Sequence, residues 1–296
     1  MAAVEEAAGI IRAGGIVAVP TETVYGLAAD ARDSAAVARI YAAKGRPSFN
    51  PLIVHVPDLA AAERIAVFDA DARALAARFW PGPLTLVLPV RAEAGIASLV
   101  TAGLDTIAIR VPAHRAMQAL LAASGAPLAA PSANASNAIS PTRAAHVAAS
   151  LGEAVPLILD DGATATGVES TIVAGRMILR PGPVTAEMLL DVLPVAAGRT
   201  AQVSAPGQLE THYAPRKPLR LEAAAREAGE WLIGFGAVAG DDTLSATGDL
   251  EEAAARLFDA LHRGDASERA RIAVAPIPET GVGVAINDRL RRAAHR

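Results

Sequence analysis

Short apolar runs alternate along most of the chain with longer segments of helical periodicity. Runs rich in Val, Ile and Leu predict strands at 15–20, 52–56, 84–90, 106–111, 128–130, 157–159, 171–173 and 177–179. Capping residues and apolar spacing predict helices over 34–44, 58–67, 69–79 and 114–124, and another that begins at Ser140-Pro141. Because the order is not a regular strand–helix–strand repeat, the pattern predicts a mixed α/β fold.

The pattern changes near residue 200. The stretch 200–208 has the small, polar composition of a linker. Beyond it, strands are predicted at 231–235 and 271–275, with helices over 250–262 and from Ile286 onward. We therefore predict a large domain over 1–198, a linker over 199–217 and a small C-terminal α/β domain over 218–296.

Composition narrows the class of protein. The chain has 296 residues, of which 52% are hydrophobic and only 3% aromatic, so its core must consist mainly of small aliphatic side chains. It contains no cysteine, which excludes disulfides, thiol nucleophiles and cysteine-ligated metals. The net charge of −4 argues against nonspecific nucleic-acid binding, and strong direct binding of tRNA is not expected.

The sequence also suggests a location. Glu5 and Glu6 stand where a signal peptide would carry Lys or Arg. No run approaches the roughly eighteen apolar residues that a membrane span needs. We expect a soluble, cytoplasmic protein without a membrane partner.

Lys44 and Arg46 stand one residue apart, where the helix predicted over 34–44 ends at Gly45. Two neighbouring cations repel each other, so a phosphate or carboxylate between them would stabilise the pair. The alternative is an ordinary solvated helix end, because the helix dipole favours cations there. The spacing indicates an anion site without deciding between the two.

The strand predicted over 106–111 contains a charged residue, Arg110, that is expected to be buried. Alternation puts Ile107 and Ile109 on one face and Arg110 on the other, inside or beside the core. A buried arginine needs a carboxylate or phosphate, supplied either by the protein or by a ligand. The residues leave both possibilities open.

Hydroxyl and amide groups gather after the strand at 128–130. Ser132 and Asn134 follow it directly, and Ser140 stands at a predicted helix start. Such groups can donate hydrogen bonds to an anion, but taken alone these residues fit a Ser or Asx turn with a helix cap better. The chain has no P-loop motif, and its six histidines are scattered, so no metal site made of protein ligands is predicted.

Several motifs occur together in one order. They are 20–26 (PTETVYG), 44–47 (KGRP), 50–52 (NPL), 80–85 (WPGPLT), 106–112 (TIAIRVP), 131–134 (PSAN), 169–171 (EST) and 180–183 (RPGP). This set resembles the YrdC/Sua5 family, and 212–215 (HYAP), 281–283 (GVG) and 287–291 (NDRLR) are similar to its longer Sua5 branch. The resemblance implies a YrdC-like twisted mixed sheet with helices, followed by a linker and a Sua5-type domain.

The resemblance also implies an activity. Family members are L-threonylcarbamoyladenylate synthases, which combine L-threonine, bicarbonate or carbon dioxide, and ATP into threonylcarbamoyl-AMP and pyrophosphate. A divalent cation, Mg2+, is expected to accompany ATP and to be held largely by phosphates and water. The product would pass to a tRNA threonylcarbamoyl transferase complex that modifies adenosine 37 of tRNA.

Site residues follow from the same resemblance. L-Threonine is expected to contact Thr23, His55, Thr106, Arg110, the backbone of Ala130, and Ser170. ATP is expected to contact Lys44, Arg46, Asn50, Ser132, Asn134, Ser140, Arg180 and Tyr213. Lys44, Arg46, Ser132 and Asn134 are the expected catalytic residues, acting by positioning and electrostatics without a covalent nucleophile. We also expect residues 200–215 to form a lid over a product that water would hydrolyse.

Rival interpretations remain. A concave basic face could instead bind double-stranded RNA, or the chain could be a regulatory protein of the same fold. RNA binding that survives saturating ATP and threonine would favour the first of these. The related carbamoyl-adenylate enzymes of hydrogenase maturation carry zinc-finger and acylphosphatase-like regions, for which this cysteine-free chain has no room.

Overall fold

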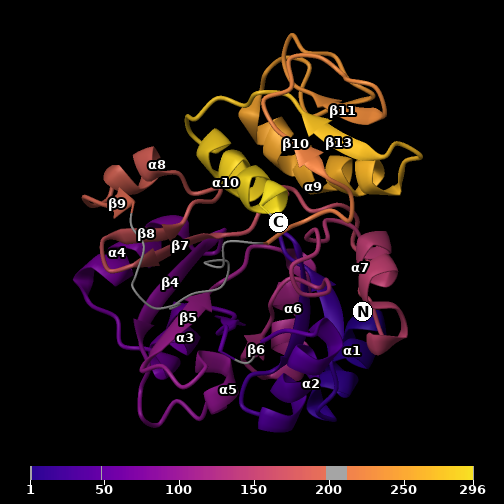
Figure 1. The fold of residues 1–296 in the computed structure, drawn as a ribbon. Coiled ribbons are helices and arrows are strands. Elements are labelled where there is room, and N and C mark those ends of the chain that lie inside the picture. Colours follow the sequence, from indigo (N-terminus) through magenta and orange to yellow (C-terminus); the bar gives the residue numbers. More distant parts are fainter. Residues whose placement is uncertain (1, 48, 198–211, 296) are drawn as a thin grey trace.

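The computed structural model describes residues 2–47, 49–197 and 212–295 and builds them around two sheets (Figure 1). The larger sheet is formed by the first two thirds of the chain and the smaller one by the last third. This arrangement confirms the predicted mixed α/β fold. Residues 199–211 of the predicted linker lie outside the described ranges.

The larger sheet is mixed. Its order is β1 (Val17–Pro20), β2 (Tyr25–Asp30), β6 (Leu128–Ala129), β3 (Ile53–His55), β5 (Thr106–Arg110), β4 (Leu84–Pro89), β7 (Thr171–Ala174), β8 (Met177–Arg180) and β9 (Ala196–Ala197). The pairs β3–β5, β4–β7 and β8–β9 are parallel, and the other neighbours are antiparallel. Parallel pairing brings the carboxyl ends of partner strands together, which later places site residues side by side.

Helices cover both faces of this sheet. They are α1 (Ala2–Arg12), α2 (Ser34–Lys44), α3 (Leu59–Ile65), α4 (Ala70–Phe79), α5 (Ser98–Thr101), α6 (Arg115–Ser124), α7 (Ala144–Leu151), a 3₁₀ turn (Gly152–Ala154) and α8 (Ala186–Leu190). Val17 and Val19 pack with α1 and α6, whereas Ala18 belongs to the main core on the opposite face. The sequence of a strand that is buried on both faces is a continuous apolar run, and β1 has such a sequence.

The smaller sheet is parallel. Its order is β10 (Leu219–Arg220), β13 (Arg271–Val274), β11 (Glu230–Gly234) and β12 (Asp242–Thr243). Helices α9 (Leu250–Ala266) and α10 (Gly283–Ala294) pack on it and lie toward the larger sheet in Figure 1. Val24, Ile139 and Val168 join the same buried cluster. The two parts therefore share apolar surface.

Some sequence predictions were wrong. The helix predicted from Ser140 begins only at Ala144, and its N-cap position, Arg143, makes no side-chain capping bond. The Ser140 hydroxyl instead donates to Glu169 Oε1 over 2.5 Å. The strand predicted at 157–159 is reduced to an isolated bridge between Ile158 and Ala18. None of the helices in the described ranges is both long and apolar enough to cross a bilayer.

Candidate active site

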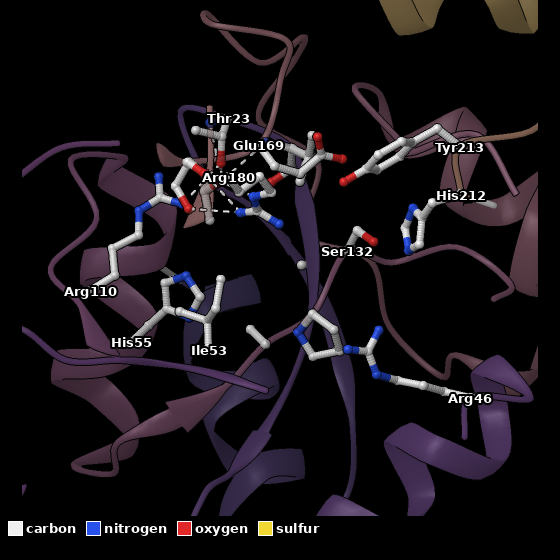
Figure 2. A pocket seen from close by; sticks show the side chains of 16 residues that line it. Thr23, Arg46, Ile53, His55, Arg110, Ser132, Glu169, Arg180, His212 and Tyr213 are labelled. Atoms are coloured by element: carbon white, nitrogen blue, oxygen red, sulfur yellow. Dashed lines mark hydrogen bonds between the residues drawn. The ribbon is translucent and has the colours of Figure 1, made fainter. Parts of the chain in front are cut away.

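A pocket opens where β3, β5 and β8 end and β7 begins (Figure 2). It is lined by Thr21, Thr23, Val24, Gly26, Arg46, Ile53, His55, Arg110, Ala130, Pro131, Ser132, Glu169, Ser170, Arg180, His212 and Tyr213. Three of these side chains are arginines and only one, Glu169, is a carboxylate. The lining is therefore suited to a ligand that carries several negative charges.

The register of two parallel strands brings His55 beside Arg110. The Arg110 guanidinium donates from Nε to the carbonyl of Gly82 over 3.1 Å and from Nη1 to Thr23 Oγ1 over 3.0 Å. Its Nη2 lies 2.7 Å from Glu22 Oε1. The protein thus supplies the internal carboxylate that the sequence left open, and Arg110 still lines the pocket.

The ion pair of Glu22 and Arg110 is buried, but its alignment is poor. Burial by itself would raise the pKa of Glu22, yet the adjacent charge of Arg110 lowers this pKa below its ordinary value. Neither Glu22 side-chain oxygen nor Arg110 Nη2 makes a hydrogen bond of good geometry within the described residues. Arg110 therefore keeps hydrogen-bonding capacity for a ligand carboxylate.

His55 is a neutral group at this wall of the pocket. Burial and then the charge of Arg110 lower the pKa of His55 to about 3. Its Nδ1 has no hydrogen-bond partner within the described residues. At neutral pH the imidazole therefore offers a hydrogen bond without adding a charge.

The end of α2 places a second cation. Asp33 caps the helix, and Gly45 ends it in the left-handed conformation with φ 58°. Arg46 then turns into the pocket and donates to the carbonyls of Asn50 and Pro51 over 3.3 and 3.0 Å. Burial lowers the pKa of Arg46 to about 10, so the side chain remains a cation at neutral pH.

Lys44 does not line the pocket. Its Nζ donates to the carbonyl of Ser132 over 2.5 Å and to that of Asn134. Burial and then the charge of Arg46 lower the pKa of Lys44. Lys44 thus holds the loop that carries Ser132, while Arg46 alone of the two cations reaches the pocket.

The third arginine, Arg180, ends β8. Its Nε and Nη2 donate to the carbonyl of Ser170 over 3.0 and 2.9 Å, and Nη2 also reaches Ser170 Oγ. Ser170 Oγ in turn lies 2.8 Å from Thr85 Oγ1. These hydrogen bonds hold the side chains of Arg180 and Ser170 together in the wall of the pocket.

Several predicted residues lie outside the lining. Asn134 donates to the carbonyls of Ala135 and Ala138 over 2.9 Å, and Asn50 is buried beside Arg46. Thr106 pairs with Pro89 at the opposite end of β5 from Arg110, roughly 13 Å away along the strand. The structure brings Thr23, Arg46, His55, Arg110, Ala130, Ser132, Ser170, Arg180 and Tyr213 to the pocket but not Lys44, Asn50, Thr106, Asn134 or Ser140.

The far wall comes from the end of the predicted linker. His212 and Tyr213 line the pocket, and Figure 2 shows both opposite Arg110 and His55. Tyr213 has φ 63°, and its hydroxyl has no hydrogen-bond partner within the described residues. Burial raises the pKa of Tyr213 and lowers that of His212. The expected lid over 200–215 falls mainly outside the described residues, so it stays a prediction.

Sequence reasoning missed several groups. It did not assign Glu22, Glu169 or His212 to the site, although each lies in a quoted motif. It also missed Arg289, which occupies one position of the buried stripe Ala285–Arg289–Ala293 on α10. A charge at four-residue spacing within an apolar stripe was the signal that could have found it.

A metal ion held by the protein alone would need several ligating side chains close together at the pocket. Within the described ranges, no group of three or more His, Asp or Glu side chains is placed to hold an ion. The one carboxylate of the lining is already bound to Ser140 and Arg289. The residues therefore do not form a closed ligand set for Mg2+.

Comparison with known proteins decides the family. A model described as "Telomere recombination", which joins Sua5, YciO and YrdC, matches residues 9–182. The chain belongs to the Sua5/YciO/YrdC family. A second model, the C-terminal domain of threonylcarbamoyl-AMP synthase, matches residues 184–295 and places the chain with Sua5 proteins that carry this domain.

Relatives of Sua5 type match almost the whole chain. A Bacillus subtilis protein named threonylcarbamoyl-AMP synthase is 40% identical and aligns over 98% of this chain and 92% of its own length. A Pyrococcus abyssi protein of the same name is 41% identical and aligns over 97% of this chain and 93% of its own length. The crystal structure of P. abyssi Sua5 complexed with L-threonine superposes with a TM-score of 0.91 at 38% identity, covering 98% of this chain and 94% of that one. The Sua5 fold therefore extends over both sheets.

Proposed function

We propose that this chain is a threonylcarbamoyl-AMP synthase, which condenses L-threonine, bicarbonate and ATP. The observation that carries the proposal is a pocket lined by three arginines, two of them buried and Arg46 half-buried, in a chain that matches synthases of this name along nearly its full length. Such a pocket can hold the carboxylate of an amino acid and a polyphosphate together. The comparisons support this function and give no support to the RNA-binding or regulatory alternatives.

L-Threonine binds at the wall formed by Arg110, His55 and Thr23. Its carboxylate pairs with Arg110, whose Nη2 lacks a well-aligned hydrogen-bond partner among the described residues. The neutral imidazole of His55 and the Thr23 hydroxyl remain for the polar groups of the amino acid. The ammonium group of threonine first gives up a proton, and the free amine then attacks the carbon of bicarbonate with loss of water, which gives a carbamate.

ATP binds toward Arg46, Ser132 and Arg180. A carbamate oxygen attacks the α-phosphorus, the bond from that phosphorus to the leaving pyrophosphate breaks, and threonylcarbamoyl-AMP forms. Arg46 and Arg180 stabilise the charge that moves onto pyrophosphate. Lys44 and Asn134 contribute by holding the Ser132 loop, which is positioning without contact to the reacting atoms.

Mg2+ enters with ATP in this proposal, held by phosphates and water, because the lining offers no closed set of ligands. The ion supplies charge neutralisation, and no step is assigned to a protein-bound metal. The product passes to a tRNA threonylcarbamoyl transferase, since a mixed anhydride of this kind must be consumed before water hydrolyses it. We place the reaction in the cytoplasm, where ATP and tRNA are available.

Pyrophosphate release tests the function. The purified chain is incubated with Mg-ATP, and L-threonine and bicarbonate are omitted in turn. Release that requires both substrates is expected. Release that needs neither of them, or RNA binding that persists at saturating ATP and threonine, would contradict the proposal.

A further inference from the structure

One wall of the pocket is fixed from outside the larger sheet, by Arg289 of α10. This side chain is only 1% exposed, although it carries a full charge. Its Nε donates to Glu169 Oε2 over 2.9 Å, Nη2 to the carbonyl of Glu169 over 3.2 Å, and Nη1 to the carbonyl of Pro181 over 2.6 Å. One guanidinium therefore joins the segment before β7 to the segment after β8.

These two segments carry the groups that line the pocket. Glu169 directly precedes Ser170, and Pro181 directly follows Arg180. Gly182 packs so closely on these segments that an added Cβ would collide with the backbone nitrogen of Thr171. Arg289 thus holds the backbone on both sides of the unit that Arg180 and Ser170 form.

The same arginine also meets the opposite wall. Its guanidinium carbon lies 5.6 Å from the centre of the Tyr213 ring, a cation–π distance, and the centre of the Phe258 ring from α9 also lies 5.6 Å from that of Tyr213. Two residues of the C-terminal part therefore support the tyrosine that faces the pocket.

Arg289 also neutralises the negative charge of Glu169 beside the pocket. Among the described residues, Glu169 is the only carboxylate of the lining, and it lies near Arg180 in Figure 2. Its oxygens are occupied by Arg289 and by the Ser140 hydroxyl. Without Arg289, a buried negative charge would face Arg180 and compete with a bound phosphate.

We propose that Arg289 is a positioning residue of the active site, supplied by the C-terminal part to occupy Glu169, so that this carboxylate does not compete with the phosphates of ATP for Arg180. The inference rests on the proposed function for the identity of the ligand. It assigns the C-terminal part a defined task, which is to complete the nucleotide side of the pocket without touching the substrate.

Binding of a non-hydrolysable ATP analogue by the full chain tests this, with L-threonine titrated separately. Arg289→Met is expected to weaken analogue binding roughly tenfold, within the range typical of coupling between sites, and to change threonine binding far less. Removing the unpaired charge with Glu169→Gln in the Arg289→Met background is expected to restore most of the affinity. Arg289→Lys keeps the charge but not the three-way hydrogen bonding. Its affinity for the analogue is expected to lie between that of Arg289→Met and that of the double variant.

The control is Arg291→Met, because Arg291 lies on the same helix, is exposed and pairs only with Glu279 among the described residues. It should bind like the wild type. Thermal melting of every variant separates binding from folding. The inference would be overturned if affinity for the analogue and affinity for threonine fell equally and in parallel with the melting temperature. It would also be overturned if a folded double variant did not recover affinity for the analogue. Because binding is measured without turnover, failure of the wild type to make product would count against the proposed function and not against this role.

Discussion

At the residue scale, sequence reasoning found the pocket's cations but not the groups that pair with them. Arg110 and Arg180 were expected at the site, and both line the pocket. Their carboxylate neighbours, Glu22 and Glu169, were not assigned. A strand pattern shows that a charge is buried, but only the packed fold shows which carboxylate lies next to it.

Lys44 shows the same limit. Its spacing from Arg46 suggested that both cations face one anion, yet the amino group turns to two backbone carbonyls of the loop at 132–134. Lys44 is the last residue of α2, and Arg46 follows the left-handed turn at Gly45. The change of chain direction at Gly45 separates the two side chains.

The role of Arg110 leads to a prediction. Arg110→Met should raise the KM for L-threonine by about tenfold to a hundredfold, because a hydrogen bond to a charged group contributes about 1.5–3 kcal/mol. The KM for ATP should change little. Steady-state pyrophosphate release measures both constants.

Glu22 complicates this variant, because removing Arg110 leaves a buried carboxylate unpaired. The substitution should therefore also be made together with Glu22→Gln, which removes that charge. Arg115→Met is the matched control, since Arg115 is exposed and pairs with Asp161. A KM for threonine that stays at the wild-type value in a folded Arg110→Met variant would refute the assignment.

At the element scale, strands buried on both faces and helices with clear caps were predicted well. The helices predicted from Asp58 and Asp69 are α3 and α4, and these two residues are their N-caps. β2 was missed because its sequence, YGLAAD, is short of β-branched residues and forms a strand only through its neighbours. The Ser140-Pro141 signal failed because tertiary contacts of Ser140 outweighed local capping preference.

Helices α7 and α9 meet through a pair of histidines. The rings of His146 and His262 stack 3.8 Å apart, and His262 Nε2 lies 3.1 Å from the carbonyl of Ser140. Burial and then the charge of His146 lower the pKa of His262 to about 4. Asp259 and Asp265 lie close enough to oppose this shift in part.

This contact predicts a dependence of stability on pH. Between about pH 6.5 and pH 4 the unfolded chain binds a proton at His262 that the folded chain does not, so the free energy of unfolding should fall as the pH is lowered. His262→Gln should make this fall shallower by up to about 1.4 kcal/mol per pH unit. Urea unfolding across the range measures the slope. The exposed His295→Gln is the control, and a slope unchanged by His262→Gln would contradict the account.

At the scale of the whole molecule, the sequence indicated two α/β parts but not their contact. Arg143 pairs with Asp259, and Arg289 with Glu169, across more than a hundred residues of sequence. Local periodicity carries no information on such pairs. The shared cluster that contains Val24, Ile139 and Val168 likewise appears only once the fold is assembled.

Because the pair of Arg289 and Glu169 and the shared apolar cluster are buried, the two parts should unfold together. The chain has two tryptophans, Trp80 beside the larger sheet and Trp231 in β11 of the smaller one. Trp80→Phe and Trp231→Phe variants each leave one reporter, and their fluorescence midpoints in urea should coincide with that from circular dichroism. A midpoint for Trp231 clearly below that for Trp80 would show that the C-terminal part opens independently.

The central claim is the identity of the product. The chain is incubated with Mg-ATP, L-threonine and ¹³C-labelled bicarbonate, and the nucleotides are separated and weighed by mass spectrometry. We expect an adenylate that contains threonine and the labelled carbon, formed together with pyrophosphate and lost in Arg46→Met. AMP or ADP alone, with no adenylate that carries the label, would contradict this claim.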